Sequence, residues 1–176
     1  MATPNELRTD SCQLAGKRAA AVVFSNYPWD PRVRRGAEAL ATEGSSVEVI
    51  CLMEMHDQPR REIFNGVDIT RLPLKRCRGG KLSYLLLYAA FILLAGGVLA
   101  SRASRRRFDL VHVHNMPDVL VFSALVPRIR GAKIILDLHD PMPELMETIF
   151  GLRKSSFSVW LLRKLEAWSV RFADAV

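Results

Sequence analysis

The chain has 176 residues, of which 49% are hydrophobic and 24% charged, with 25 Lys and Arg residues against 18 Asp and Glu residues. This length suits one α/β domain with a full core and is short for two, and the composition excludes intrinsic disorder. Three dispersed cysteines without a CxxC pair exclude a disulfide scaffold and a zinc ribbon, which indicates a reduced, cytoplasmic protein. Residues 1–17 are mostly polar and carry no signal-peptide core, so we expect a flexible tail before a single domain, 18–176.

Short apolar runs alternate with amphipathic segments along the chain. The expected strands are residues 19–24, 47–52, 67–72, 110–114 and 134–138. A helix is expected to begin after Asp30 and Pro31, an N-cap and a first-turn proline, and to end at Gly44. Further helices are expected at 118–130 and 156–173. This alternation predicts an α/β fold, a Rossmann-like, doubly wound parallel sheet with helices on both faces.

The positive charge gathers around one apolar segment. Residues 71–107 contain nine basic residues and no acidic one, and they bracket an uncharged stretch of 20 residues, 82–101. A nucleic-acid-binding protein usually spreads basic and aromatic residues over a whole face, so we expect no nucleic-acid partner. The flanking charges instead predict contact with an anionic membrane surface.

Segment 82–101 allows two membrane arrangements. As a helix about 30 Å long it could cross the hydrocarbon core once. Basic residues flank both of its ends, however, so they select no orientation, and a single crossing would separate strands that must pair in one sheet. We therefore favour a helix that packs one face on the sheet and dips the other into the membrane interface. The protein would then be peripheral on the inner face of the plasma membrane.

Ligands of doubly wound sheets bind beyond the carboxyl ends of the strands. Three segments are expected there, residues 25–35, 114–118 and 139–144. Their polar and aromatic candidates for a site are Asn26, Trp29, Asp30, Arg32, Arg35, His114, Asn115, Asp118, His139, Asp140 and Glu144. Neither GxGxxG nor GxxxxGK[ST] occurs, so a dinucleotide-dependent dehydrogenase or a P-loop enzyme is not expected.

Four stretches resemble the N-terminal domain of the retaining, family-4-like GT-B glycosyltransferases. They are SNYPWDPRVRRGAEALATEGSSVEVICL, NGVDITRLP, FDLVHVHNMPDVLVFSALVPRIRGAKIILDLHDPMPE and LEAWSVRFADAV. The resemblance implies one half of a GT-B fold, with the acceptor on this domain and the nucleotide-sugar donor, a co-substrate, mainly on a C-terminal domain. It implies no obligatory metal or other cofactor. Many members act at the cytoplasmic membrane face on lipid-linked acceptors.

The resemblance also implies roles for individual residues. Residues 25–35 match the loop that approaches the donor diphosphate and the acceptor, and His139 matches a catalytic histidine that hydrogen-bonds the transferred sugar. Arg32 and Arg35 are candidate phosphate partners because a guanidinium binds phosphate with two hydrogen bonds, and a solvated helix face is the alternative. Asp140 and Glu144 could orient acceptor hydroxyls or cap the following turn.

Two alternatives remain open at this point. His112 and His114 lie two residues apart on one expected strand, so their rings point to the same face. With Asp137, His139 and Asp140 they could form the metal site of a hydrolase, although we favour a hydrogen-bonded core histidine and no metal. The second alternative follows from the missing donor half. We expect an isolated chain that is an inactive fragment, or else a non-catalytic membrane- and acceptor-binding subunit whose partner supplies that half in trans.

Overall fold

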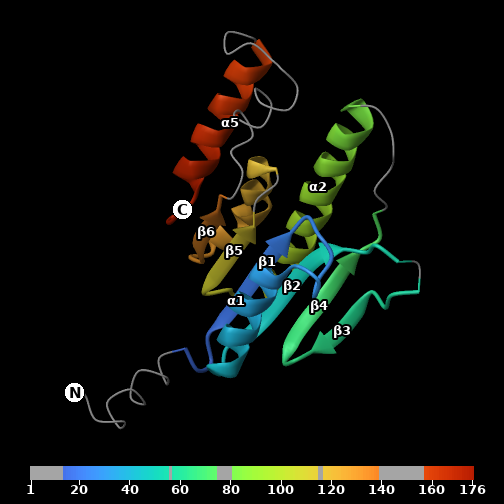
Figure 1. Ribbon diagram of the computed structural model, residues 1–176. Helices are drawn as coiled ribbons and strands as arrows, with labels where there is room; N and C mark the ends of the chain where they lie inside the picture. The colour runs from blue at the N-terminus through green and yellow to red at the C-terminus, as the bar shows by residue number, and fades with distance from the viewer. Residues whose placement is uncertain (1–13, 56, 75–80, 115–116, 139–156) are drawn as a thin grey trace, which may run out of the picture.

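The computed structural model describes residues 14–55, 57–74, 81–114, 117–138 and 157–176, and a six-stranded sheet forms its centre (Figure 1). The strands are β1 (Arg18–Val23), β2 (Ser46–Leu52), β3 (Arg61–Phe64), β4 (Val67–Leu72), β5 (Leu110–His114) and β6 (Lys133–Asp137). They lie in the order β3-β4-β2-β1-β5-β6. All neighbours pair in parallel except β3, which is antiparallel to β4.

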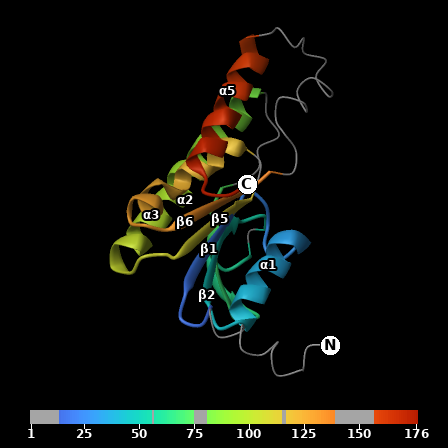
Figure 2. The same cartoon turned by 90° about the vertical axis from the view of Figure 1, so that its left-hand side faces the viewer.

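Helices cover the two faces of this sheet unequally. One face carries α1 (Pro31–Thr42), whereas the other carries α2 (Lys81–Arg105), the 3₁₀ helix η3 (Asp118–Ala124), α3 (Leu125–Ile129) and α5 (Phe157–Phe172) (Figure 2). Each face buries its own apolar cluster, one built around Val33 and Ala37 of α1 and the other around Phe91 and Leu99 of α2. This architecture confirms the Rossmann-like, doubly wound fold that the sequence predicts.

The elements agree with their sequence-based bounds to within two residues, with three exceptions. Strand β3 was not expected, because its sequence, REIF, contains no apolar run. In the structure its residues alternate between exposed and half-buried. The helix expected at 118–130 is divided into η3 and the short α3, and Pro127 lies in α3. The helix expected at 82–101 is longer, since Lys81–Arg105 is helical. The expected tail, 1–17, lies mostly outside the described residues.

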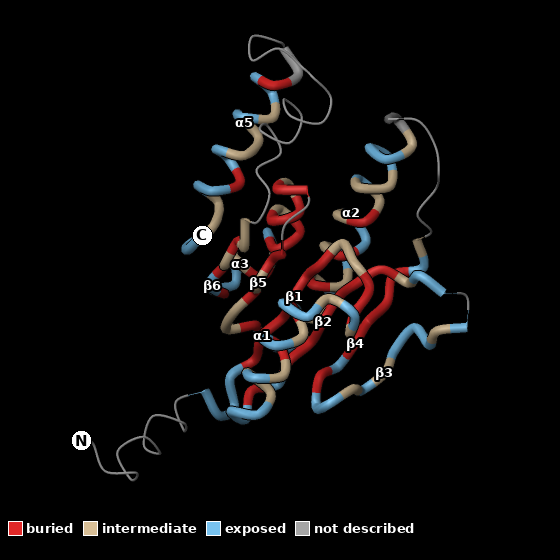
Figure 3. Tube along the Cα trace, in the orientation of Figure 1, coloured by how far each residue is buried: buried red, intermediate tan, exposed pale blue. Residues whose placement is uncertain are grey.

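Helix α2 changes character along its length (Figure 3). From Phe91 onward every fourth residue is fully buried, through Ala95 and Leu99 to Ala103. A Cβ atom at Gly96 would lie 3.5 Å from the Ser123 carbonyl oxygen, at van der Waals contact, so η3 packs directly on the helix here. Residues 83–90, in contrast, include no buried residue. The second half of α2 therefore belongs to the core, and the first half extends away from it.

A buried carboxylate connects α2 to the sheet. Glu48 of β2 accepts hydrogen bonds from the guanidinium groups of Arg18 and Arg102, and Arg102 Nη2 donates to Thr70 Oγ1 at 2.6 Å. The Arg18 guanidinium also lies 4.0 Å from the centroid of the Phe108 ring. Arg102 therefore belongs to an internal ion-pair network that fixes the end of α2 to β2 and β4.

This network corrects one expectation from the sequence. Not all nine basic residues of 71–107 face outward, because Arg102 binds Glu48 and Arg71 is 4% exposed. Arg71 Nη2 lies 2.7 Å from Glu62 Oε2, and its Nη1 donates to the Pro59 carbonyl at 3.0 Å. These two arginines stabilise the sheet and are not available to a membrane surface.

Replacing Glu48 with Ala should destabilise the fold by about 3 to 5 kcal/mol, because two arginines would remain close together without their shared carboxylate. Urea denaturation followed by circular dichroism measures this change. Asp68→Ala, at an exposed position on neighbouring β4, is the control and should stay within about 0.5 kcal/mol of the unchanged protein. Equal unfolding midpoints for the two variants would contradict this role for Glu48.

Candidate functional site

The strand order reverses between β1 and β5, and the chain places its candidate site at the carboxyl ends of these strands. A cavity of about 350 Å³ opens there beside the start of α1. It is lined by Ser25, Asn26, Trp29, Asp30, Pro31, Arg32 and Glu54. The segment after the first strand thus forms most of this pocket, as the sequence predicts.

Asn26 and Glu54 form one wall of the pocket. The Asn26 side chain is 5% exposed, and its Nδ2 donates to Glu54 Oε2 at 3.4 Å. Its Oδ1 is buried without a hydrogen-bond partner among the described residues. A buried polar atom without a partner is uncommon and is more typical of a functional site than of a core.

The sequence analysis missed Glu54. The signal that could have found it is its position two residues after β2, the strand that pairs with β1. The carboxyl ends of these two parallel strands meet at the same edge of the sheet. Glu54 therefore reaches the loop that carries Asn26.

Asp30 organises the start of α1. It is the N-cap, its Oδ1 accepts from the Arg32 backbone N–H at 3.2 Å, and Ser25 Oγ donates to its Oδ2 at 3.4 Å. Burial alone would raise the pKa of Asp30, but the hydrogen bonds and the charge of Arg32 outweigh it and lower this pKa below its usual value. Asp30 is therefore ionised near neutral pH and partly offsets the positive end of the helix.

The structure separates the two arginine candidates. Arg32 lines the pocket, and its Nε lies 3.5 Å from Asp30 Oδ1. Arg35 does not line it, and its Nε donates to the Pro31 carbonyl at 3.1 Å along the exposed side of the helix. Of the two residues, Arg32 is the one placed to meet an anion in this pocket.

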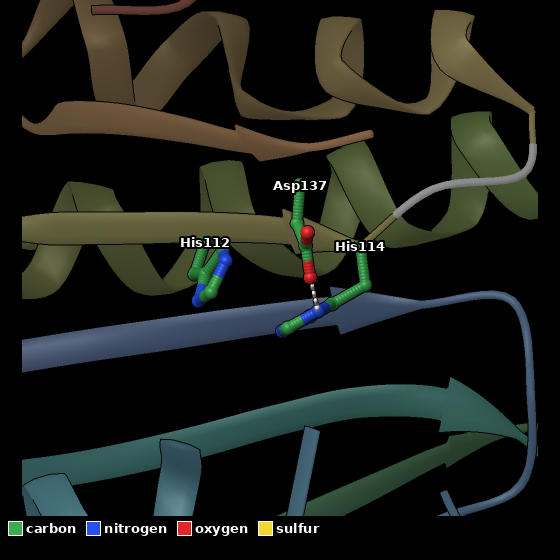
Figure 4. Close-up of side chains that lie close together, drawn as sticks. All are labelled: His112, His114 and Asp137. Atoms are coloured by element: carbon green, nitrogen blue, oxygen red, sulfur yellow. Dashed lines mark hydrogen bonds and ion pairs between the residues drawn. The ribbon is translucent and has the colours of Figure 1, made fainter. Parts of the chain in front are cut away.

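A second group of polar side chains lies across the pairing of β5 with β6 (Figure 4). His114 is 5% exposed, and its Nδ1 lies 3.0 Å from Asp137 Oδ2. The His112 and His114 rings lie side by side, with their centroids 4.0 Å apart. Both histidines face the α1 side of the sheet, since they pair with Ala21 and Val23 of β1.

Burial and the neighbouring His112 lower the pKa of His114 to about 4, against the opposing effects of Asp137 and Asp30. The ring is therefore neutral near pH 7. Because an ionised carboxylate can only accept, neutral His114 donates its Nδ1 proton to Asp137 and keeps Nε2 as an acceptor. His114 is thus a neutral, oriented imidazole at the carboxyl end of β5.

His112, His114 and Asp137 could also hold a metal ion. Their candidate ligand atoms all lie within 4.8 Å of one another, and imidazole and carboxylate are ligands that zinc accepts. The two further members of the metal site considered from the sequence, His139 and Asp140, lie outside the described residues. The described part therefore retains three of the five candidate ligands.

The remaining candidates divide into three groups. Trp29 lines the pocket with 71% of its surface exposed. Asp118 is buried at the first position of η3 and does not line the pocket. The candidates outside the described residues are Asn115, His139, Asp140 and Glu144.

The low pKa of His114 predicts a pH effect on stability. Since the unfolded state takes up this proton at its ordinary pKa of 6.5 and the folded state only at about 4, the free energy of unfolding should fall as the pH drops through this window. The groups that act on His114 are His112, Asp137 and Asp30. The loss should be on the order of 3 kcal/mol, complete near pH 4.

His114→Asn isolates this effect, because carboxylates that titrate in the same window are present in both proteins. Urea denaturation at several pH values should show a steeper loss of stability below pH 6.5 in the unchanged protein than in the variant. Parallel stability curves would show that His114 does not titrate with a lowered pKa.

Comparisons with known proteins agree with this geometry. The family model of the glycosyl transferase 4-like domain matches residues 30–176. Sucrose-phosphate synthase from Thermosynechococcus elongatus is similar with a TM-score of 0.64 at 15% identity, over 90% of this chain and 41% of that one. The C-terminal domain of a Pyrococcus furiosus hydrogenase is similar with a TM-score of 0.50 at 14% identity, over 71% of this chain and 92% of that one. No curated protein matches the sequence.

At these identities the two structures show a shared fold alone, whereas the family match extends over most of the chain. The chain spans less than half of the sucrose-phosphate synthase. The resemblance inferred from the sequence is confirmed. The chain belongs to the glycosyl transferase 4-like family, and its fold is that of the N-terminal, Rossmann-like domain of a GT-B glycosyltransferase.

Proposed function

We propose that this chain is the acceptor-side half of a retaining glycosyltransferase. The enzyme would transfer a sugar from a nucleotide-sugar to a lipid-linked or cell-envelope acceptor at the cytoplasmic face of the membrane. The observation that carries the proposal is the pocket at the β1–β5 reversal, in a domain of this family. Its polar wall combines a cation, Arg32, with two carboxylates, Asp30 and Glu54.

These groups fit the two requirements of glycosyl transfer. The leaving diphosphate needs positive charge or N–H donors, which the guanidinium group of Arg32 supplies. The acceptor hydroxyl must be held at the anomeric carbon, and the carboxylates of Asp30 and Glu54 can accept hydrogen bonds from sugar hydroxyls. His139 is proposed as the catalytic residue beside the transferred sugar, from the resemblance in sequence.

The donor half is proposed to come from a C-terminal domain, joined to this chain or supplied in trans. The chain by itself should therefore transfer no sugar and should bind nucleotide-sugars weakly. If the partner is a separate subunit, this chain would be its membrane- and acceptor-binding component. Transfer measured with a radiolabelled donor, with and without the C-terminal half, tests this division, and robust transfer by the isolated chain would overturn it.

Arg32→Ala in the two-domain enzyme should raise the KM for the donor by about tenfold, since one charge-assisted hydrogen bond to phosphate is lost. Arg35→Ala is the matched control, because it removes an arginine of the same helix that does not line the pocket. Its KM should change less than about twofold. Equal effects of the two substitutions, measured by initial rates at varied donor concentration, would show that Arg32 acts through the overall charge of the helix.

His139→Ala in the same enzyme should lower kcat by at least about 10²-fold, the low end for loss of one positioned catalytic group. Single-turnover measurements at saturating donor and acceptor separate this loss from weaker binding. His114→Asn, a substitution at the end of β5, should lower kcat less than His139→Ala. Near-normal turnover of the His139→Ala enzyme would remove this histidine from the site.

A further inference from the structure

The first half of α2 exposes an apolar surface that no described residue covers. Tyr84, Leu85 and Leu86 are 43%, 63% and 62% exposed, and Leu93, two helical turns after Leu86, is 76% exposed. The most apolar stretch of 18 residues within Ser83–Arg105 has a mean hydropathy of 2.1, yet only 17% of it is buried. A helix of a soluble core would hide such a surface, so this part of α2 is built to contact something apolar.

The part of α2 that follows Leu94 cannot join this surface. Phe91, Ala95, Leu99 and Ala103 fill the core, and Arg102 is bound to Glu48. The last exposed large apolar side chain of the helix is Leu94. From residue 83 to residue 94 a helix rises about 16 Å, roughly half of the hydrocarbon thickness of a bilayer. In this fold, the exposed part of α2 is too short to span a membrane and long enough to enter one leaflet.

Helix α5 presents a second apolar surface on the same face of the sheet. Trp160 and Leu161 lie near its first turn and are 52% and 41% exposed. Lys164 follows one turn later, with its Nζ 5.8 Å from the Trp160 ring centroid. Tryptophan beside a basic residue is typical of side chains at the membrane–water interface. The first turns of α2 and α5 both extend beyond the carboxyl ends of the strands (Figure 1).

We propose that these two helix starts form one shallow anchor in an anionic lipid bilayer. The anchor consists of Tyr84, Leu85, Leu86, Leu93 and Leu94 of α2 with Trp160 and Leu161 of α5. This inference rests on the proposed action at a membrane and specifies its geometry. The occupant is an anionic lipid surface, because its negative charge complements the basic residues that precede the exposed part of α2 in the sequence. These residues are Lys75, Arg76, Arg78 and Lys81, and no acidic residue accompanies them.

The anchor also orients the site. Both helix starts extend past the edge of the sheet at which the pocket lies, so a bilayer at the anchor would lie beyond that same edge. A lipid-linked acceptor could then reach the pocket while its chain stays in the leaflet. The exposed arginines that follow α2, Arg106 and Arg107, lie at its other end, about 35 Å from its start. They should contribute less to binding than the basic residues before the helix.

The test uses the chain as it is and vesicles of phosphatidylcholine with phosphatidylglycerol. The unchanged protein should float with these vesicles, should be partly released by high salt, and should be fully released by alkaline carbonate. The double substitution Leu85→Glu/Leu86→Glu should weaken binding at least tenfold. Ile63→Glu, at a 74% exposed position on the edge strand β3, is the matched control and should bind as the unchanged protein does.

Several outcomes would overturn the anchor. Retention through alkaline carbonate would show a true span, and binding that L85E/L86E leaves unchanged would place the lipid contact elsewhere. Self-association of the unchanged chain that L85E/L86E abolishes, without any vesicle binding, would show that a second copy covers this surface. Circular dichroism and urea midpoints close to those of Ile63→Glu confirm that the double variant is folded.

Fluorescence tests the part played by α5. A Trp29→Phe/Trp168→Phe variant leaves Trp160 as the single tryptophan. Its emission should shift to shorter wavelength on the vesicles, and lipids brominated near the headgroup should quench it more than lipids brominated near the chain end. An unchanged Trp160 spectrum on bound protein would remove α5 from the anchor.

These measurements remain separate from the proposed function, because vesicle binding needs neither donor nor C-terminal half. In the two-domain enzyme, L85E/L86E should leave the rate of transfer to a water-soluble acceptor unchanged. It should lower the rate of transfer to a vesicle-bound acceptor at least tenfold. Sugar transfer by an enzyme that does not bind vesicles would overturn the anchor alone. Vesicle binding by an enzyme that transfers no sugar would overturn the function alone.

Discussion

A parallel sheet is stable only when both of its faces are covered, and this requirement organises the rest of the molecule. On one face, α2, η3, α3 and α5 complete the cover, so the residues of β5 and β6 that point there are fully buried. On the other face α1 covers β1 and β2, whereas the α1-side residues of β5 and β6 include His112, His114 and Asp137. Among the described residues, these polar side chains thus gather on the α1 side of the sheet, beside the point at which the strand order reverses.

The same requirement gives α2 its two roles. Its second half supplies the apolar contacts that cover the sheet, and the Arg102–Glu48 pair fixes that half in place. Its first half continues beyond the edge of the sheet (Figure 1), and residues 83–90 include no buried residue. A continuous helix therefore carries an apolar sequence through two environments, and the sequence alone shows no boundary between them.

Much of the fold could be predicted because its signals are local. Continuous apolar runs mark the five parallel strands, and Asp30 with Pro31 marks the start of α1 through an N-cap bond that forms within three residues. Strand β3 escaped prediction because only its pairing with β4 makes it a strand. The ion pairs of Arg71 and Arg102 could not be predicted either. Arg71 of β4 binds Glu62 of β3, and Arg102 of α2 binds Glu48 of β2. Charge along a sequence does not show which charges are internal.

The site was predictable to the level of segments and not of contacts. The loop after β1 was expected to carry candidate site residues, and it lines the cavity at the carboxyl ends of the strands. The distinction between Arg32 and Arg35 depends on which residues the cavity reaches at the start of α1, and the bond between His114 and Asp137 depends on the register of β5 with β6. Glu54 enters the pocket only because β2 lies next to β1. Each of these facts arises from tertiary pairing.

The divided helix also constrains how a more soluble form of this protein could be engineered. Deleting the apolar segment, residues 82–101, would remove Phe91 and Leu99 from the core and would detach the last helical turn, which carries the Arg102 partner of Glu48. The sheet would lose the cover of one face and would expose a larger apolar area than the deletion removed. Polar replacements limited to Leu85, Leu86, Leu93 and Leu94 would change the surface and leave every buried contact of the helix in place.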